Sequence, residues 1–216
     1  MGESEARLVC DLLGIESLVG EIDSQTQQSS ATSSAILGPF YCPNTRLLSK
    51  GRSIVQNGTF TGQLTHFSGL VLDYRKRPIE GATLEVWQAA PNGMYLEDNL
   101  RGQFKTDKEG KFEMYCLRPS SYKIPDNGLA GMLLKMLDRH PWRPGHIHVM
   151  VRAEGFRILT TQLYDSEDEY LKSDAAFAVK EDLVVRFEPR AEDPQAKWTL
   201  KFDFILVSEE GPKKEH

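Results

Sequence analysis

The chain has 216 residues, of which 40% are hydrophobic and 26% are charged, and its formal net charge is −5. This length suits one substantial domain with a sizeable core, and the acidic balance argues against nucleic-acid binding. Three scattered cysteines argue against a disulfide framework, and without a signal-like leader or a membrane-length apolar run the sequence predicts a cytoplasmic protein that has no membrane partner.

Residues 1–19 are the first predicted element, an amphipathic helix. Four apolar side chains recur at steps of four, three and four: Leu8, Leu12, Ile15 and Val19. This spacing places them on one helical face. A lone short helix is marginal in water, so this face is expected to dock on the main body or on a second copy of the chain. Residues 20–34 are rich in Ser, Thr and Gln, which predicts a polar linker.

Residues 35–207 are predicted to form the main body, a mainly β domain. Short β-forming runs alternate with turn residues at 69–73, 82–87, 102–106, 111–116, 146–153, 158–164, 183–187 and 198–207. About eight such strands predict an antiparallel β-sandwich rather than a parallel sheet. Residues 129–137 have a helical pattern, and residues 208–216 form a charged tail.

Two of the five histidines lie one residue apart in the run 142–148. Side chains along a β-strand alternate between its two faces, so a strand that begins near Gly145 would point His146 and His148 to the same side. Two imidazoles on one face can share a metal ion, or they can simply form a polar stripe. Any further ligands must come from elsewhere in the chain.

Tyr95 and Tyr122 are expected in loops, each after the end of a predicted strand. A loop tyrosine is usually an amphipathic residue at a surface or rim, and this interpretation is favoured for either residue taken alone. Two phenolate oxygens together with two imidazoles would suit a hard ion such as Fe(III) better than zinc. The charge of the metal would then remove the phenol protons, whose ordinary pKa is about 10.

Eight short motifs together resemble the intradiol ring-cleavage dioxygenases. They are ILGPFY at 36–41, LEVWQA at 84–89, GMY at 93–95, NLRG at 99–102, TD at 106–107, RPSSY at 118–122, RPGHIH at 143–148 and TTQ at 160–162. The likeness runs from about residue 36 to residue 187. Details at 122–125 and 170–175 are closer to the hydroxyquinol branch than to the catechol branch.

The resemblance implies a ligand set and an activity. Tyr95, Tyr122, His146 and His148 would hold one Fe(III) per chain. The enzyme would cleave an aromatic 1,2-diol of the catechol or hydroxyquinol type with O₂, and the product would be a cis,cis-muconate-type or maleylacetate-type diacid. The implied partners are therefore a small aromatic diol and O₂.

The resemblance also implies roles for residues around the ligands. Arg143 would stabilise negative charge that develops on the ring, Gln162 would assist by hydrogen bonding, and Tyr122 would give way to the bound diol. The ring pocket is expected to be lined by Ile36, Leu37 and Pro39.

The chain departs from this family pattern near its N-terminus. Relatives of the catechol and hydroxyquinol types carry a long N-terminal helical region that builds their dimer, and residues 1–19 match only its last helix. A homodimer is therefore expected, although the helical region that forms the dimer in these relatives is shortened in this chain. The stretch 96–98 is also short, which would leave one pocket wall more open.

Two other interpretations stay open on the residues alone. One combines His146 and His148 with Glu154 or Asp165 as a two-histidine, one-carboxylate site for Fe(II) or zinc. The other takes the β-rich body as a transthyretin-like or immunoglobulin-like binding module, because such sandwiches host many functions.

Overall fold

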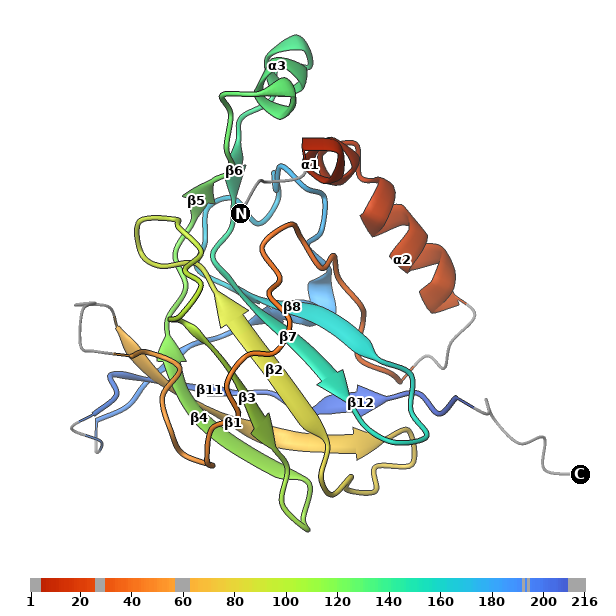
Figure 1. Cartoon of the computed structure of the whole chain (residues 1–216), viewed down its shortest axis with the longest axis vertical. Helices are drawn as coiled ribbons and strands as arrows, with labels where there is room; N and C mark the ends of the chain where they lie inside the picture. The colour runs from red at the N-terminus through yellow and green to blue at the C-terminus, as the bar shows by residue number, and fades with distance from the viewer. Residues whose placement is uncertain (1–4, 26–29, 57–62, 192, 194, 210–216) are drawn as a thin grey trace, which may run out of the picture.

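Strands dominate the computed structural model, which describes residues 5–25, 30–56, 63–191, 193 and 195–209 (Figure 1). The helices are α1 (Glu5–Leu12), α2 (Ile15–Gln25), α3 (Leu129–Met136) and the short 3-10 helix η1 (Glu181–Leu183). The strands are β1 (Leu64–Asp73), β2 (Thr83–Gln88), β3 (Arg101–Lys105), β4 (Lys111–Leu117), β5 (Tyr122–Lys123), β6 (Trp142–Arg143), β7 (His146–Arg152), β8 (Leu159–Asp165), β9 (Val184–Val185), β10 (Glu188–Pro189), β11 (Trp198–Lys201) and β12 (Phe204–Leu206). The predicted mainly β class is confirmed.

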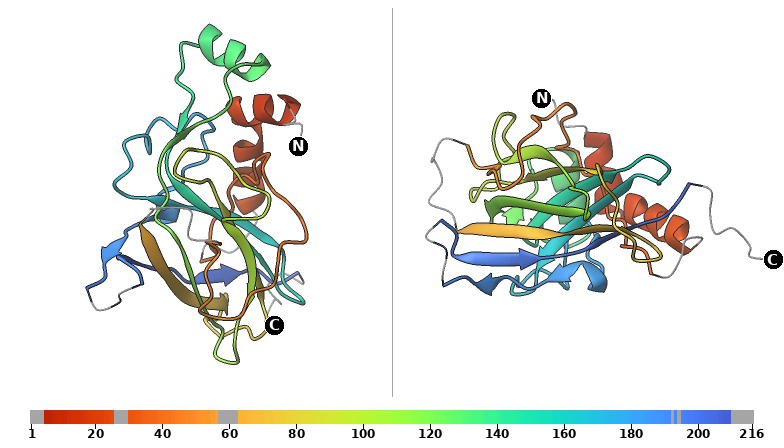
Figure 2. Two further views of the ribbon diagram at one scale, coloured as in Figure 1. Left: turned by 60° about the vertical axis from the view of Figure 1, so that its left-hand side comes forward. Right: turned by 90° about the horizontal axis from the view of Figure 1, so that it is seen from below.

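Two five-stranded sheets form the body (Figures 1 and 2). One has the order β10-β11-β1-β12, with β4 paired to β1, and the other has the order β3-β2-β7-β8-β9. Strand β1 pairs in parallel with β11 and β12, and β8 pairs in parallel with β9, whereas the other pairs are antiparallel. The predicted sandwich therefore has mixed sheets rather than purely antiparallel ones.

The single strand predicted over 198–207 is divided into β11 and β12. Strand β11 pairs with the first half of β1 and β12 pairs with its second half. Between them the backbone carbonyl of Phe202 approaches Gly69 so closely that a Cβ there would lie 1.8 Å from the oxygen. A residue without a side chain is needed at this position because the two backbones cross there.

The core lies between the two sheets and includes alternate residues of β7. Ile147, Val149 and Val151 are fully buried in the main apolar cluster. Because successive side chains point to opposite faces, His146 and His148 lie on the other face of the same strand. One strand thus supplies both core residues and candidate site residues.

The N-terminal region is two helices rather than one. Gly14, with φ +71°, separates α1 from α2, and α2 continues to Gln25, so the first residues of the predicted linker are helical. Leu8 and Leu12 pack with Ile124, Ala130 and Leu134 beside α3, which confirms docking of this half on the body. Most of the predicted charged tail, residues 210–216, lies outside the described residues.

The second half of the predicted apolar face does not dock. Ile15, Leu18, Val19 and Ile22 on α2 are exposed, and their spacing places them on one side of the helix.

Within the described ranges no helix is long and apolar enough to cross a membrane. Helix α3 matches the predicted segment 129–137, and Figure 2 shows it beyond the edge of the sheets, next to α1.

Candidate metal centre and active site

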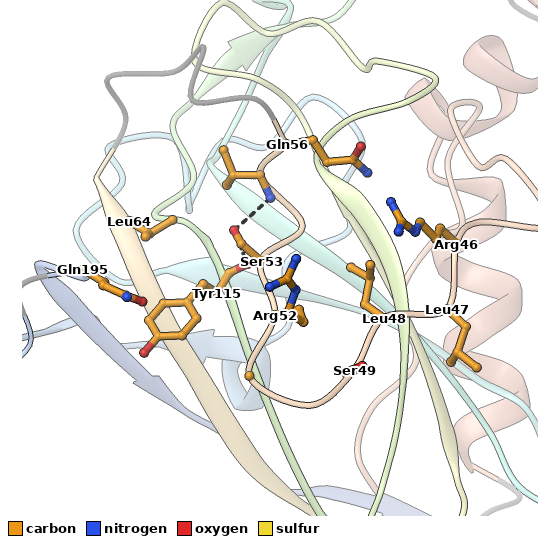
Figure 3. Close-up of a pocket in the computed structure, with 12 residues that line it drawn as sticks. Arg46, Leu47, Leu48, Ser49, Arg52, Ser53, Gln56, Leu64, Tyr115 and Gln195 are labelled. Atoms are coloured by element: carbon orange, nitrogen blue, oxygen red, sulfur yellow. Dashed lines mark hydrogen bonds between the residues drawn. The ribbon is translucent and has the colours of Figure 1, made fainter.

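A cavity of about 740 Å³ contains none of the predicted site residues (Figure 3). It lies under the segment 46–56, and Tyr115 and Gln195 form part of its wall. The residues singled out by the sequence lie instead at the start of β7 and on the loops around it. The volume of a cavity therefore does not identify the candidate site in this protein, whereas the chemistry of the side chains does.

The oxygen and nitrogen atoms of four predicted residues converge there. Tyr95 Oη lies 3.3 Å from Tyr122 Oη. The same oxygen lies 3.3 Å from His146 Nε2 and 3.1 Å from His148 Nε2. The two Nε2 atoms are 3.2 Å apart. Tyr95 lies in the loop between β2 and β3, as predicted, whereas Tyr122 lies on the short strand β5 rather than in a loop.

Neighbouring rings and one glycine orient these side chains. The Trp87 ring stacks on His148, with ring centroids 4.6 Å apart and planes inclined by 9°. Phe40 stacks on Tyr95 at 4.5 Å and 13°. Gly93, with φ +83°, lies behind Tyr122, and a Cβ on it would be 2.9 Å from the Tyr122 Cβ. The cluster is therefore held by packing around it.

Both imidazoles are neutral in this environment. Burial and the Arg143 charge lower the pKa of His146 to about 3, and burial together with His146 and Arg143 lowers the pKa of His148 well below its usual value. His146 Nδ1 lies 2.7 Å from the Pro144 carbonyl, which can only accept a hydrogen bond. The Nδ1–H therefore donates to it, and the Nε2 lone pair faces the cluster.

The donor set fits a metal ion. Burial raises the pKa of both phenols, so Tyr95 and Tyr122 become phenolates only if a cation compensates their charge. Two imidazole Nε2 atoms and two phenol oxygens at these separations repel unless protons or a cation lie between them. Two oxygens and two nitrogens suit a hard trivalent ion.

The carboxylate alternative has no such geometry. Asp165 forms an ion pair with Arg118, and Glu154 is exposed in a turn. Over the part of the chain that the structure describes, no three side chains of His, Cys, Asp or Glu come together as a metal-sized group. The two tyrosines are therefore needed to complete any site built on His146 and His148.

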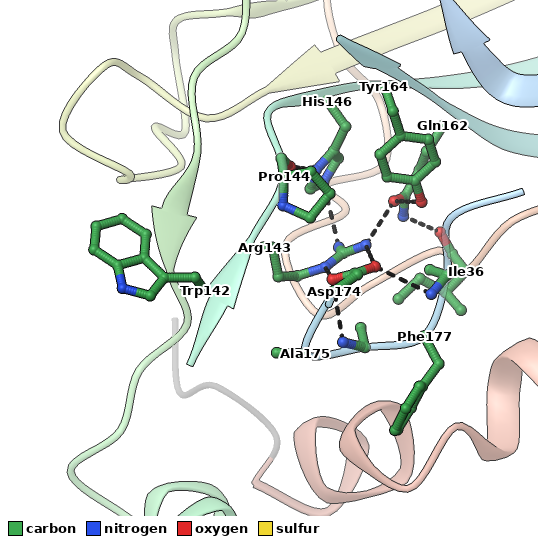
Figure 4. A network of polar contacts seen from close by, with 12 residues as sticks. Ile36, Trp142, Arg143, Pro144, His146, Gln162, Tyr164, Asp174, Ala175 and Phe177 are labelled. Carbon is green, nitrogen blue, oxygen red and sulfur yellow. Dashed lines mark hydrogen bonds and ion pairs between the residues drawn. The ribbon is translucent and has the colours of Figure 1, made fainter. Parts of the chain in front are cut away.

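Arg143 is fixed beside this cluster by a buried ion pair (Figure 4). Its Nε donates to Asp174 Oδ1 at 2.9 Å and its Nη2 donates to Asp174 Oδ2 at 3.1 Å. Nη1 lies 3.3 Å from His146 Nε2. Burial alone would raise the pKa of Asp174, but the guanidinium and two backbone N–H groups hold this pKa below its usual value. Both members of the pair are therefore charged.

Gln162 connects the arginine to the segment that contains Ile36. Its Oε1 accepts hydrogen bonds from Arg143 Nη2 at 3.0 Å and from Tyr164 Oη at 2.7 Å. Its Nε2 donates to the Ile36 carbonyl at 2.6 Å. Two donors on one side and one acceptor on the other determine the orientation of the amide.

A cavity of only about 20 Å³ lies between the cluster and α1. Ile36 and Pro39 line it, together with Tyr122 and Arg143, whereas Leu37 does not. The Leu37 N–H donates instead to Glu16 Oε1 at 2.7 Å. Two of the three predicted pocket residues therefore lie beside the cluster.

Asp11 of α1 lines the same cavity and was missed from the sequence. It is 4% exposed, and its Oδ1 has no hydrogen-bond partner among the residues that are described. Burial and a hydrogen bond with Glu16 raise the pKa of Asp11 to about 7. The sequence carried a signal: Asp11 shares a helical face with Leu8 and Leu12, and a carboxylate on a buried apolar stripe is unusual.

Asp174, Tyr164, Trp87 and Phe40 were also missed as site residues. They reach the site through pairing and loop packing that join segments far apart in the sequence, such as the 31 residues between Arg143 and Asp174. No periodicity in the sequence marks them. Asp174 lies in the small-residue run 173–176, which is the only local hint of a tight turn around a carboxylate.

Comparisons with known proteins show the family to which the chain is similar. A family model described as Dioxygenase matches residues 36–208. The chain is 40% identical to intradiol ring-cleavage dioxygenase prcA of Aspergillus niger, over 94% of this chain and 68% of that protein. It is 44% identical to catechol 1,2-dioxygenase of Candida albicans, over 94% of this chain and 71% of that protein.

Solved structures show the same likeness. Hydroxyquinol 1,2-dioxygenase from Pseudomonas putida superposes with a TM-score of 0.86 at 36% identity, covering 94% of this chain and 75% of that one. Catechol 1,2-dioxygenase from Acinetobacter radioresistens superposes with a TM-score of 0.89 at 29% identity, covering 98% and 76%.

Replacing Asp11 by Asn should change how stability depends on pH. The folded-state pKa of about 7 lies above the value of about 4 expected in the unfolded chain, so unfolding releases a proton between these values. The contribution of Asp11 to the free energy of unfolding should therefore fall by on the order of 2 kcal/mol as the pH rises from about 5.5 to 8. Urea unfolding of both proteins across this range measures it. If the free energy of unfolding changed equally with pH in wild type and D11N, the raised pKa of Asp11 would be contradicted.

Proposed function

Because the chain belongs to the intradiol ring-cleavage dioxygenases of the catechol and hydroxyquinol type, we propose that Tyr95, Tyr122, His146 and His148 hold one Fe(III) per chain. The observation that carries this proposal is the convergence of two phenol oxygens and two imidazole nitrogens within 3.1–3.3 Å of one another. The proposed reaction cleaves an aromatic 1,2-diol with O₂ to a cis,cis-muconate-type or maleylacetate-type diacid.

The iron, when bound, supplies the electron-accepting chemistry through which a diol becomes reactive toward O₂. Tyr122 then acts as a base: its phenolate Oη takes a proton from one diol hydroxyl. Burial supports this step because it raises the pKa of Tyr122, so its phenolate would readily accept a proton. Tyr122 also lines a cavity of about 450 Å³ together with Tyr95, which supports entry of the diol from that side.

Arg143 stabilises the negative charge that spreads onto the diol ring. It is 4% exposed and always charged, and Asp174 fixes its orientation, so the charge is in place before the substrate arrives. Gln162 holds Nη2 from the other side and ties it to the Ile36 carbonyl. Ile36 and Pro39 form apolar walls that exclude water from the ring.

Iron-loaded protein should absorb visible light through tyrosinate-to-Fe(III) charge transfer. Replacing Tyr95 by Phe should abolish most of the band, and Y122F should shift or weaken it, because each removes one phenolate ligand. The matched control is Y115F on β4, whose hydroxyl bonds Asp193 rather than the cluster. Absorption spectra and metal analysis of the three variants test this. A colourless protein with stoichiometric zinc would overturn the iron proposal.

Replacing Arg143 by Ala should keep iron and colour but lower kcat for oxygen consumption by about 100-fold or more, because a fixed charge near the developing anion is lost. The change also leaves Asp174 buried and unpaired. The double variant R143A/D174A removes that defect and should stay as slow as R143A. Recovery of turnover in the double variant would show that the loss came from the unpaired carboxylate.

Asp11 supports a substrate with a third ring hydroxyl. Asp11 lines the small cavity with Arg143, and its Oδ1 has no hydrogen-bond partner among the described residues, so a third ring hydroxyl that occupies this cavity could donate to the carboxylate. We expect kcat/KM for hydroxyquinol relative to catechol to fall about tenfold in D11L, since a buried hydrogen bond of about 1.4 kcal/mol is lost. In D11N, which keeps an acceptor oxygen, the ratio should fall less. Equal ratios in wild type and D11L would exclude this role.

The exposed stripe on α2 supports a homodimer. Ile15, Leu18, Val19 and Ile22 form a continuous apolar face that a second copy could cover. The double substitution L18E/I22E should therefore lower the mass measured by sedimentation velocity from that of two chains to that of one. A monomeric wild-type protein at micromolar concentration would contradict the proposal.

A further inference from the structure

Arg101, the first residue of β3, is a buried cation whose hydrogen-bonding capacity is largely unused. Its side chain is 5% exposed and its Nε donates to the Leu96 carbonyl at 2.7 Å. Its Nη1 is buried and has no hydrogen-bond partner, and no described carboxylate forms an ion pair with it. Among the described residues, its side chain forms a hydrogen bond only with this neutral carbonyl group.

Other well-buried arginines of this chain are compensated. Arg143 is paired with Asp174, and Arg118 binds both oxygens of Asp165. Burying a guanidinium without a counter-charge is unfavourable, because it loses hydration and gains no Coulomb attraction. Arg101 is therefore in the state expected of a side chain whose anionic partner is a ligand.

The position of Arg101 links it to the candidate active site. It pairs across the sheet with Trp87, whose indole stacks on His148. It also lines a cavity of about 450 Å³ whose wall includes Tyr95 and Tyr122. Its charge is close enough to contribute to the lowered pKa of His148. Arg101 thus lines a cavity that reaches two of the proposed iron ligands.

The charges around this cavity favour an anion. Lys123 adds a second cation to its wall, and its Nζ lies 5.1 Å from the Trp142 ring centroid without bonding to a described carboxylate. Glu97 also lines the cavity, but it is exposed and makes no ion pair with Arg101. A volume of about 450 Å³ accommodates more than a single-ring diol.

We propose that Arg101 anchors a carboxylate subsite at the entrance to the active site. This inference rests on the proposed function, because the carboxylate is carried either by the ring of the substrate or by the open-chain diacid that ring cleavage produces. The guanidinium binds it in a charge-assisted hydrogen bond, and Lys123 adds long-range attraction. No bond is made or broken at this subsite.

Direct binding tests the subsite without turnover. Calorimetric titration of the iron-loaded protein with cis,cis-muconate should give a Kd that rises about tenfold or more in R101M, because one charge-assisted hydrogen bond to a carboxylate is lost. R101Q serves if R101M does not fold, and R101K should recover part of the affinity. The control is R46M, which removes an exposed arginine from a neighbouring cavity that Arg101 also lines. An equal loss in R46M would overturn the subsite.

A second measurement identifies the source of the carboxylate. The ratio of kcat/KM for 3,4-dihydroxybenzoate to that for catechol should fall about tenfold in R101M if the ring carries the carboxylate. If the muconate Kd rises while this ratio is unchanged, the subsite serves the product. If neither quantity changes, the proposal is wrong.

The same experiments separate this inference from the proposed function. Arg101-dependent binding of muconate without turnover of any diol would support the subsite and overturn the proposed reaction. Turnover of diols that is unaffected by R101M in both measurements would leave the proposed reaction standing and overturn the subsite.

Discussion

The two-residue repeat of β7 is the constraint on which the rest of the structure depends. Ile147, Val149 and Val151 anchor the strand in the core between the sheets. The same backbone therefore has no freedom to rotate His146 and His148 away from the opposite face, where β2 and β8 flank them. Packing of the core therefore also fixes the orientation of the two imidazoles. A shift of the strand register by one residue would turn the histidines into the core and the apolar side chains toward the site.

A second level of organisation is polar. The chain of contacts from Asp174 through Arg143 and Gln162 to the Ile36 carbonyl joins a loop, two strands and the extended segment that covers the site. Every member is buried and hydrogen-bonded, so the network specifies one arrangement of these segments instead of several. Arg101 differs because it is just as buried and lacks a charged partner in the described chain. This contrast is the reason for proposing that the partner of Arg101 is a ligand.

The sequence predicted what local periodicity controls and missed what non-local contacts control. The facing histidines follow from alternation along a single strand, and the class of fold follows from short β-runs between turns. The break at Phe202 arises because Gly69, far away in the chain, meets its carbonyl. Helix α2 runs past residue 20, and Ile22 continues the helical spacing of the apolar stripe, a signal that the polar composition of 20–34 obscured. Asp174 reaches Arg143 through a loop whose path no pattern encodes.

Gly14 has a consequence for how the protein responds to its surroundings. On the N-terminal side of this glycine, Leu8, Asp11 and Leu12 of α1 form a wall of the small cavity beside Tyr122. On the other side, α2 presents its apolar stripe to the outside. Only Leu13 and Gly14 separate the two helices. If covering the stripe shifts α1, the affinity of the cavity for its ligand changes by some factor, and thermodynamic linkage requires the ligand to change the affinity of the stripe by the same factor. If a second copy of the chain covers the stripe, as proposed, the helix pair would then couple that assembly to the occupancy of the cavity.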